Sequence, residues 1–312
     1  MIRLRTLLAA LGLTLAASAC TPKDPHASCA RSAEKAPVVK LITAGQAPHA
    51  PMRLVVTKGQ QEKMVMTMKM AMAMDGVTKL PRTQLPPMLM TMGVTVTEVA
   101  ANGDFRQDFI LEGSDVLAGD GSPPAMVEAM RTSMGAMKGM KGHARLSSRG
   151  EVCESSLEIP DTVSPQQKQT MDGLQQSLQQ VSVPFPDEPV GVGARWEVTY
   201  QLNQLQGMDL TQVATYELLE RTATTVKIAA TIVQSAKPQT VNPPGLPPGA
   251  VVHLDSLDSK GSGTTVFDLK KVVPQGSGMT LSTAFAMTIE MSGQKEVMKM
   301  NMDLDVSIEP GK

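Results

Sequence analysis

The chain has 312 residues, with 29 Lys and Arg against 30 Asp and Glu, and a net charge of −1. Because it lacks a basic run, the chain has no electrostatic footprint for binding nucleic acid. One Trp, two Tyr and five Phe provide few rings for stacking on bases or sugars, whereas 24 Met are available for an apolar core or surface.

The N-terminus is typical of an export signal. Arg3 and Arg5 precede a short apolar stretch at residues 7–16, and small residues follow it. This stretch is too short to span a bilayer as a helix. We therefore expect residues 1–19 to be a signal peptide.

The residues around Cys20 point to a lipid anchor. Ala17-Ser18-Ala19-Cys20 resembles the lipobox of bacterial lipoproteins, although Ala17 stands where Leu is usual. In that family the Cys becomes the first mature residue and carries acyl chains. The resemblance implies a bacterial envelope protein, on the outer membrane and facing the periplasm or the surface. The same residues also fit an ordinary Ala-x-Ala cleavage site, which would leave Cys20 as a plain thiol.

Residues 20–50 are rich in Ala, Pro, Ser and Lys and show no period, so we expect a flexible tether. If Cys20 is acylated, Cys29 and Cys153 remain as a pair. Export implies an oxidising compartment in which a disulfide persists. The sequence leaves open whether these two cysteines are bridged or unpaired, because it does not report their separation.

Alternation with a period of two predicts β-strands along most of the chain. In residues 64–74 every second residue is Met, so six thioethers share one face of a strand. Similar alternation occurs in residues 88–96 and 298–308. Ala101-Asn102-Gly103-Asp104 is a hairpin turn signal. Further strands are expected at residues 52–57, 105–111, 195–202, 210–220, 225–233, 264–273 and 279–291. A hairpin around Arg149-Gly150 is expected at residues 143–159, and an extended loop at 237–249.

Two helices are expected. Ser122, followed by two prolines, fits an N-cap, and Met126, Met130, Met134 and Met137 follow at helical spacing. A capping box with Pro at the first helical position opens the second helix, residues 164–182.

These elements predict a mainly β (α+β) fold: a curled antiparallel sheet or half-barrel with two helices against its concave side. The β-rich domain should span residues 51–310. Residues 59–68 align without gaps to 293–302, which indicates either duplication or coincidence between two Met-rich hairpins. Duplicated halves would be 51–160 and 190–310, joined by the helix at 164–182.

Catalytic signatures are missing from the sequence. It has no G-x-S-x-G, no Walker loop, and no H-E-x-x-H or C-x-x-C spacing. We expect no catalytic residue, no metal ligand set and no cofactor, and hence no enzyme.

The Met-rich elements allow three interpretations. They can form a solid core, or they can line a cavity for an apolar ligand, since Met is flexible and adapts to varied shapes. Thioethers also select Cu(I), for which Met137, Met140 and His143 are the candidates. For the cavity, the expected lining is Met64, Met66, Met68, Met70, Met72, Met88, Met90, Met92, Met126, Met130, Met134, Met287, Met298, Met300 and Met302.

The lipobox-like signal, the strand entry Gly193-Ala194-Arg195-Trp196 and the Pro-separated strand-rich halves resemble uncharacterised lipoproteins of large-genome bacteria such as myxobacteria. The expected architecture also resembles half-barrel lipoprotein carriers and receptors of the cell envelope, which bind acyl chains between sheet and helices. The resemblance implies a lipid-anchored, non-catalytic protein that takes an acyl chain or another apolar ligand. Its partners would be the membrane and that ligand, not nucleic acid, and no protein partner is indicated.

Overall fold

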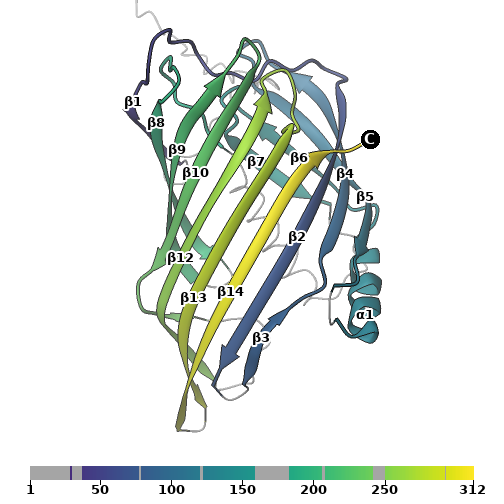
Figure 1. Cartoon of the computed structure of the whole chain (residues 1–312), viewed down its shortest axis with the longest axis vertical. Coiled ribbons are helices and arrows are strands. Elements are labelled where there is room, and N and C mark those ends of the chain that lie inside the picture. The colour runs from purple at the N-terminus through teal and green to yellow at the C-terminus, as the bar shows by residue number, and fades with distance from the viewer. Residues whose placement is uncertain are drawn as a thin grey trace, which may run out of the picture.

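The computed structural model describes residues 29, 37–76, 79–119, 122–158, 183–205, 208–241, 250–291 and 293–312. In this part the chain forms a 14-stranded antiparallel sheet and one helix (Figure 1). The elements are β1 (Val38–Thr43), β2 (Gln61–Asp75), β3 (Leu80–Gln84), β4 (Met88–Val99), β5 (Phe105–Val116), α1 (Pro124–Gly135), β6 (Lys141–Leu146), β7 (Val152–Leu157), β8 (Arg195–Leu205), β9 (Met208–Arg221), β10 (Thr225–Ala236), β11 (Gln239–Val241), β12 (Val251–Asp268), β13 (Gly276–Met291) and β14 (Gln294–Pro310).

The strands follow the order β1-β8-β9-β10-β12-β13-β14-β2-β4-β5-β6-β7, with β3 paired to β2 and β11 paired to β12. The last strand, β14, thus pairs with β2 and joins the early strands to the late ones. The expected mainly β fold with a curled antiparallel sheet is confirmed. β1 and β7 are its two edges.

The sheet curls so that one face becomes an interior. Val96 of β4 and Phe105 of β5 belong to the same buried cluster as Trp196 of β8 and Leu218 of β9. In the sheet order, five strands (β10, β12, β13, β14 and β2) separate β4 from β9. Only a strongly curved sheet brings such distant strands into contact, so the face carrying these residues is concave, and we call it the inner face.

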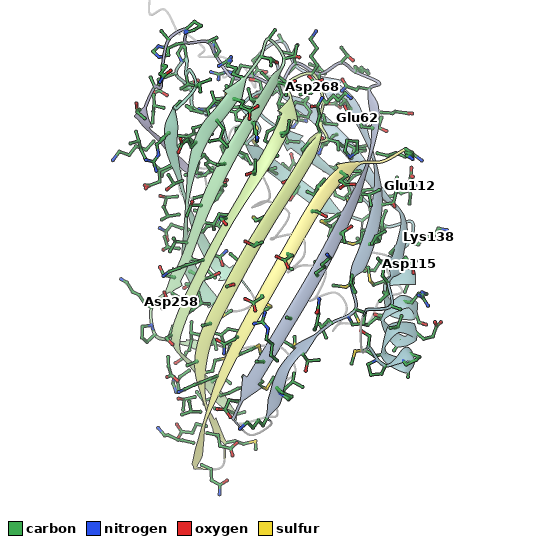
Figure 2. The ribbon with its side chains drawn as sticks, viewed as in Figure 1. Glu62, Glu112, Asp115, Lys138, Asp258 and Asp268 are labelled. Carbon is green, nitrogen blue, oxygen red and sulfur yellow. A yellow bond between two sulfur atoms is a disulfide. The ribbon has the colours of Figure 1, made fainter. Side chains whose placement is uncertain are left out.

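Alternation along each strand explains which face is inner. On β14, Met300, Met302 and Leu304 point inward, while the intervening Asn301 and Asp303 point outward. A half-buried antiparallel strand is expected to alternate in this way, with one face packed and one face in water. Figure 2 shows the outer side, with Asp258 of β12 among the polar residues there.

One end of the curled sheet is filled by a compact core. This upper end in Figure 1 holds the β4–β5 and β6–β7 turns, the β12–β13 loop and the C-terminus. Met52, Leu54 and Val56 lie here in the buried cluster, together with Phe185. The Trp196 indole N–H donates to the Pro184 carbonyl at 2.9 Å, which satisfies the one polar atom of a fully buried ring.

Several expectations need correction. Residues 38–43, expected to be tether, form β1 and pair with β8, so the fold begins before residue 51. A short strand, β11, lies in the expected loop at 237–249. The first helix exists, but Pro123 occupies its N-cap without a side-chain cap, rather than Ser122. The second expected helix, residues 164–182, lies outside the described residues.

Candidate ligand-binding face

The six methionines of β2 form a continuous ladder on the inner face. On one side, Met72 and Met74 stand opposite Met302 and Met300 of β14. On the other side, Met68 stands opposite Met88 of β4, with two further Met–Met pairs above it. Register thus brings three strands into one apolar surface, the methionine face, which comprises Met64, Met66, Met68, Met70, Met72, Met74, Met88, Met90, Met92, Met298, Met300 and Met302.

The methionine face is half-buried along its whole length. Every methionine in it falls between the fully buried and the exposed range. The inner face of β8 and β9, across the curl, is different, because Val198, Ala214 and Leu218 there are wholly buried and Tyr200 nearly so. The two walls of the interior are therefore packed unequally, and the methionine wall retains apolar surface that packing has not covered.

The other expected lining residues fall into two groups. Met287 lies opposite Met298 and joins a second inner cluster at the lower end with Leu254 and Phe285. On α1, Met134 is buried, and Met130 packs in the same cluster, which also contains Met88 and Met90 of the methionine face. Met126 is 36% exposed and belongs to none of the clusters of buried residues. The buried stripe of α1 is centred on Val127 and Met134, and Met126 lies beside it in the first turn.

Several polar side chains also lie on the inner face. Ser259 and Thr283 share a hydrogen bond of 2.8 Å, and Gln234 donates to Gln212 at 2.7 Å. These pairs lie in neighbouring positions across β9, β10, β12 and β13. Ser114, opposite Met90, has a buried hydroxyl without a hydrogen-bond partner in the described part. Cross-strand register brings these polar residues together on the apolar face.

The outer face carries a different hollow. About 220 Å³ in volume and half open, it is lined by Gly93, Arg106, Asp108, Lys141 and His143 among others, and by no methionine. The Arg106 guanidinium lies 3.3 Å from the Asp108 carboxylate inside it. The hollow therefore combines this ion pair with the apolar side chains of Phe109 and Ile110.

Two of the three residues considered for Cu(I), Met137 and His143, lie on opposite faces of the sheet. Met137 packs in the α1 cluster, against the methionine face. His143 lies opposite Asp108 and lines the outer hollow, 4.0 Å from Glu154. Among the described residues, no three His, Cys, Asp or Glu side chains come close enough to hold a metal ion.

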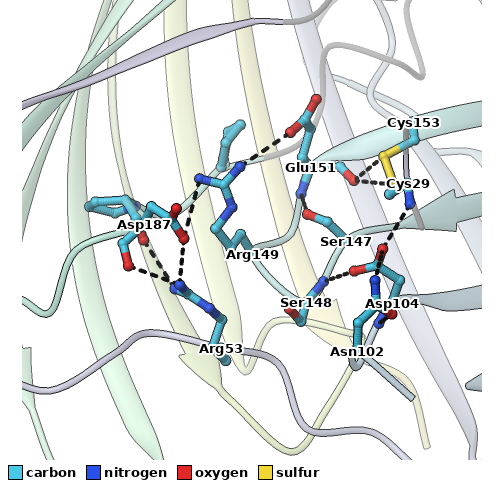
Figure 3. A network of polar contacts seen from close by, with 12 residues as sticks. Cys29, Arg53, Asn102, Asp104, Ser147, Ser148, Arg149, Glu151, Cys153 and Asp187 are labelled. Carbon is cyan, nitrogen blue, oxygen red and sulfur yellow. Dashed lines mark hydrogen bonds and ion pairs between the residues drawn. A yellow bond between two sulfur atoms is a disulfide. The ribbon is translucent and has the colours of Figure 1, made fainter. Parts of the chain in front are cut away.

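Cys29 and Cys153 form a disulfide at the upper end, with Cα atoms 5.5 Å apart. Figure 3 shows the polar network around it. The Asp104 carboxylate, 6% exposed, accepts from the backbone N–H groups of Cys29 and Ser148 at 2.8 and 3.1 Å. It also accepts from the Asn102 side chain at 2.9 Å. The chain is thus fastened at residue 29 by a covalent bond and by hydrogen bonds.

The same network joins the segment before β2, which carries Arg53, to the segment before β8, which carries Asp187. The Arg53 guanidinium donates to the Asp187 carboxylate at 2.8 Å and to the Pro186 carbonyl at 3.1 Å (Figure 3). Burial is the main cause that lowers the pKa of Arg53, with Asp187 opposing it. Arg149 lies 4.0 Å from the same Asp187 carboxylate. These contacts join Arg53, Arg149 and Asp187 at the upper end.

The pKa values of three other side chains are shifted by packing or by hydrogen bonds. Hydrogen bonds from Arg131 lower the pKa of Asp115 at the surface beside α1. Hydrogen bonds from Ser282 and Arg82 lower the pKa of Asp303 on the outer face. Burial strongly raises the pKa of Tyr216, which stacks on Trp196 with ring centroids 5.4 Å apart. Each shift belongs to a packing contact or a surface ion pair.

No helix in the described residues has the length and apolar character needed to cross a membrane. Residues 165–271 match a family of unknown function (DUF6263), and this stretch includes β8 to β12. No curated protein matches the chain. Similar solved structures include one titled "Asymmetric conductivity of engineered proteins" (9% identity, TM-score 0.18) and a mutant of Rh. blastica porin (8% identity, TM-score 0.19). Each alignment covers 79% of this chain and 100% of the other, and TM-scores this low carry no argument.

Proposed function

We propose that this chain is an exported lipoprotein, anchored through Cys20, that binds an acyl chain or similar apolar ligand on its methionine face. The observation that carries the proposal is the incompletely buried apolar wall: methionines from β2, β4 and β14 share the concave face and remain half-buried. A solid core would cover such side chains as completely as it covers Val198 and Ala214.

Methionine suits a surface whose filling changes. Its unbranched, polarizable side chain adapts to irregular apolar shapes, and a ligand that leaves does not require a fixed packing arrangement. Each 100 Å² of apolar surface removed from water contributes about 2.5 kcal/mol before the costs of association are subtracted. Binding should therefore depend on chain length more than on headgroup chemistry.

Adjacent residues on β2 provide a matched test. Met68→Glu places a carboxylate on the methionine face, whereas Thr67→Glu adds the same charge to the outer face of the same strand. We expect the Met68→Glu protein to take up a fluorescent fatty acid at least ten-fold more weakly than the Thr67→Glu protein. Circular dichroism checks that both variants fold, and Met68→Leu should bind like the unaltered protein. Absence of uptake by the unaltered protein, together with no lipid in its native mass spectrum, contradicts the proposal.

A further inference from the structure

The way the chain enters the fold limits how the domain sits on a membrane. Cys153 lies at the start of β7, directly after the turn that joins β6 to β7. Since β6 pairs with the upper part of β5, next to the β4–β5 turn, this point belongs to the upper end of the sheet. The Cys29–Cys153 disulfide therefore holds residue 29 at that end.

The chain length on either side of this bond decides what the anchor permits. Cys29 follows Cys20 by nine residues, which span at most about 30 Å when fully extended. The sheet is taller than that, because β14 alone has 17 residues and extends about 55 Å. Without the disulfide, the first strand would begin at Val38, and the preceding residues could reach about 60 Å.

We infer that the disulfide orients the domain, so that its upper end faces the bilayer and its lower end, with the β13–β14 hairpin, points away. The inference rests on the proposed anchor at Cys20. A lower end turned toward the membrane would require Cys29 to stand farther from the bilayer than nine residues can reach. Loss of the disulfide nearly doubles the reach and removes this restriction.

The upper end presents exposed lysines. Lys58, Lys270 and Lys271 are exposed there and form no ion pair within the described ranges. The side chain of Gln60 donates to the Lys270 carbonyl, which holds the turn carrying Lys58 against the β12–β13 loop. Glu62 lies at this end as well (Figure 2), but its carboxylate accepts from the backbone N–H groups of Val272 and Val273.

Energy transfer to labelled headgroups tests the orientation. The full lipidated chain is placed in phosphatidylcholine–phosphatidylglycerol vesicles, with a donor fluorophore on a bio-orthogonal amino acid at position 270 or 291. Lys270 lies at the upper end, and Met291, 48% exposed, lies at the tip of the β13–β14 hairpin. We expect transfer from position 270 to exceed transfer from position 291 several-fold.

Two variants isolate the cause. Cys29→Ser with Cys153→Ser, or a flexible insertion of about 20 residues between positions 21 and 28, should each reduce the difference between the two labels. The insertion keeps the disulfide and serves if the double variant fails to fold. Equal transfer from both positions in an anchored protein overturns the orientation, and so does a difference that survives the insertion. Failure of the unaltered protein to sediment with vesicles, with no effect of Cys20→Ser, overturns the anchor itself.

Discussion

The Asp104 carboxylate accepts a hydrogen bond from the backbone N–H of Cys29 at 2.8 Å, across 75 residues of chain. Asp104 belongs to the β4–β5 turn and also accepts from Ser148 in the β6–β7 turn. One buried carboxylate therefore joins two turns of the sheet to the incoming N-terminal segment. Three N–H donors satisfy this buried side chain, as the burial of a polar group requires.

Asp104→Ala should lower the free energy of unfolding by about 3 kcal/mol, because it leaves several buried donors without an acceptor. Asp108→Ala is the matched control, since Asp108 is half-exposed and pairs with Arg106 on the outer face. Surface pairs of that kind contribute about 0–1 kcal/mol. Urea unfolding of both variants measures the difference, and equal midpoints would contradict the role given to Asp104.

Removing the Cys29–Cys153 bridge should destabilise the protein by up to about 5 kcal/mol, since it closes a loop of 124 residues in the unfolded chain. The measurement is thermal unfolding of Cys29→Ser with Cys153→Ser. Dithiothreitol should bring the unaltered protein down to the variant's melting temperature and leave the variant unchanged. A variant as stable as the unaltered protein would count against a structural bridge.

Trp196 is the only tryptophan and is fully buried, so native fluorescence should be blue-shifted and should move to the red on unfolding. Trp196→Phe should cost about 1–3 kcal/mol, because it leaves the Pro184 carbonyl without its donor. Equilibrium unfolding followed by circular dichroism gives this value. A native emission maximum close to that of the unfolded chain would contradict the burial of Trp196.

Stability should fall above about pH 10, the ordinary pKa of tyrosine, because burial raises the pKa of Tyr216 in the fold. As the pH rises above about 10, Tyr216 loses its phenolic proton in the unfolded chain before it does so in the folded protein. The stabilisation is fully present below that pH and is lost as the pH rises toward the folded pKa. The measurement is unfolding at pH 9 to 11, and Tyr216→Phe should flatten the slope. An unchanged slope in that variant would show that other groups cause the loss.

Local alternation was enough to predict much of the sheet. The period of two in residues 64–74 and 298–308 identified strands with one apolar face, and both lie in β2 and β14. The turn at residues 101–104 and the first helix were also predicted, because their signals are local. The pairing of β2 with β14 was not, since it joins segments that lie more than 200 residues apart.

Other features depend on tertiary contacts that leave little trace in sequence. β1 carries no clear period and becomes a strand because β8 offers it an edge. The exposure of Met126 follows from how α1 rotates on β5, which helical spacing alone does not determine. The hydrogen bond between Ser259 and Thr283 depends on the register of β12 against β13, which local alternation does not determine.

Photolabelling tests the central claim most directly. A diazirine fatty acid is bound to the full chain, activated by light, and its attachment sites are mapped by peptide mass spectrometry. Labels should fall on inner-face residues such as Met68, Met70 and Met302, and unlabelled fatty acid should compete with them. Labels on outward residues such as Thr67 and Asp303, or labelling that does not saturate, would contradict binding on the methionine face.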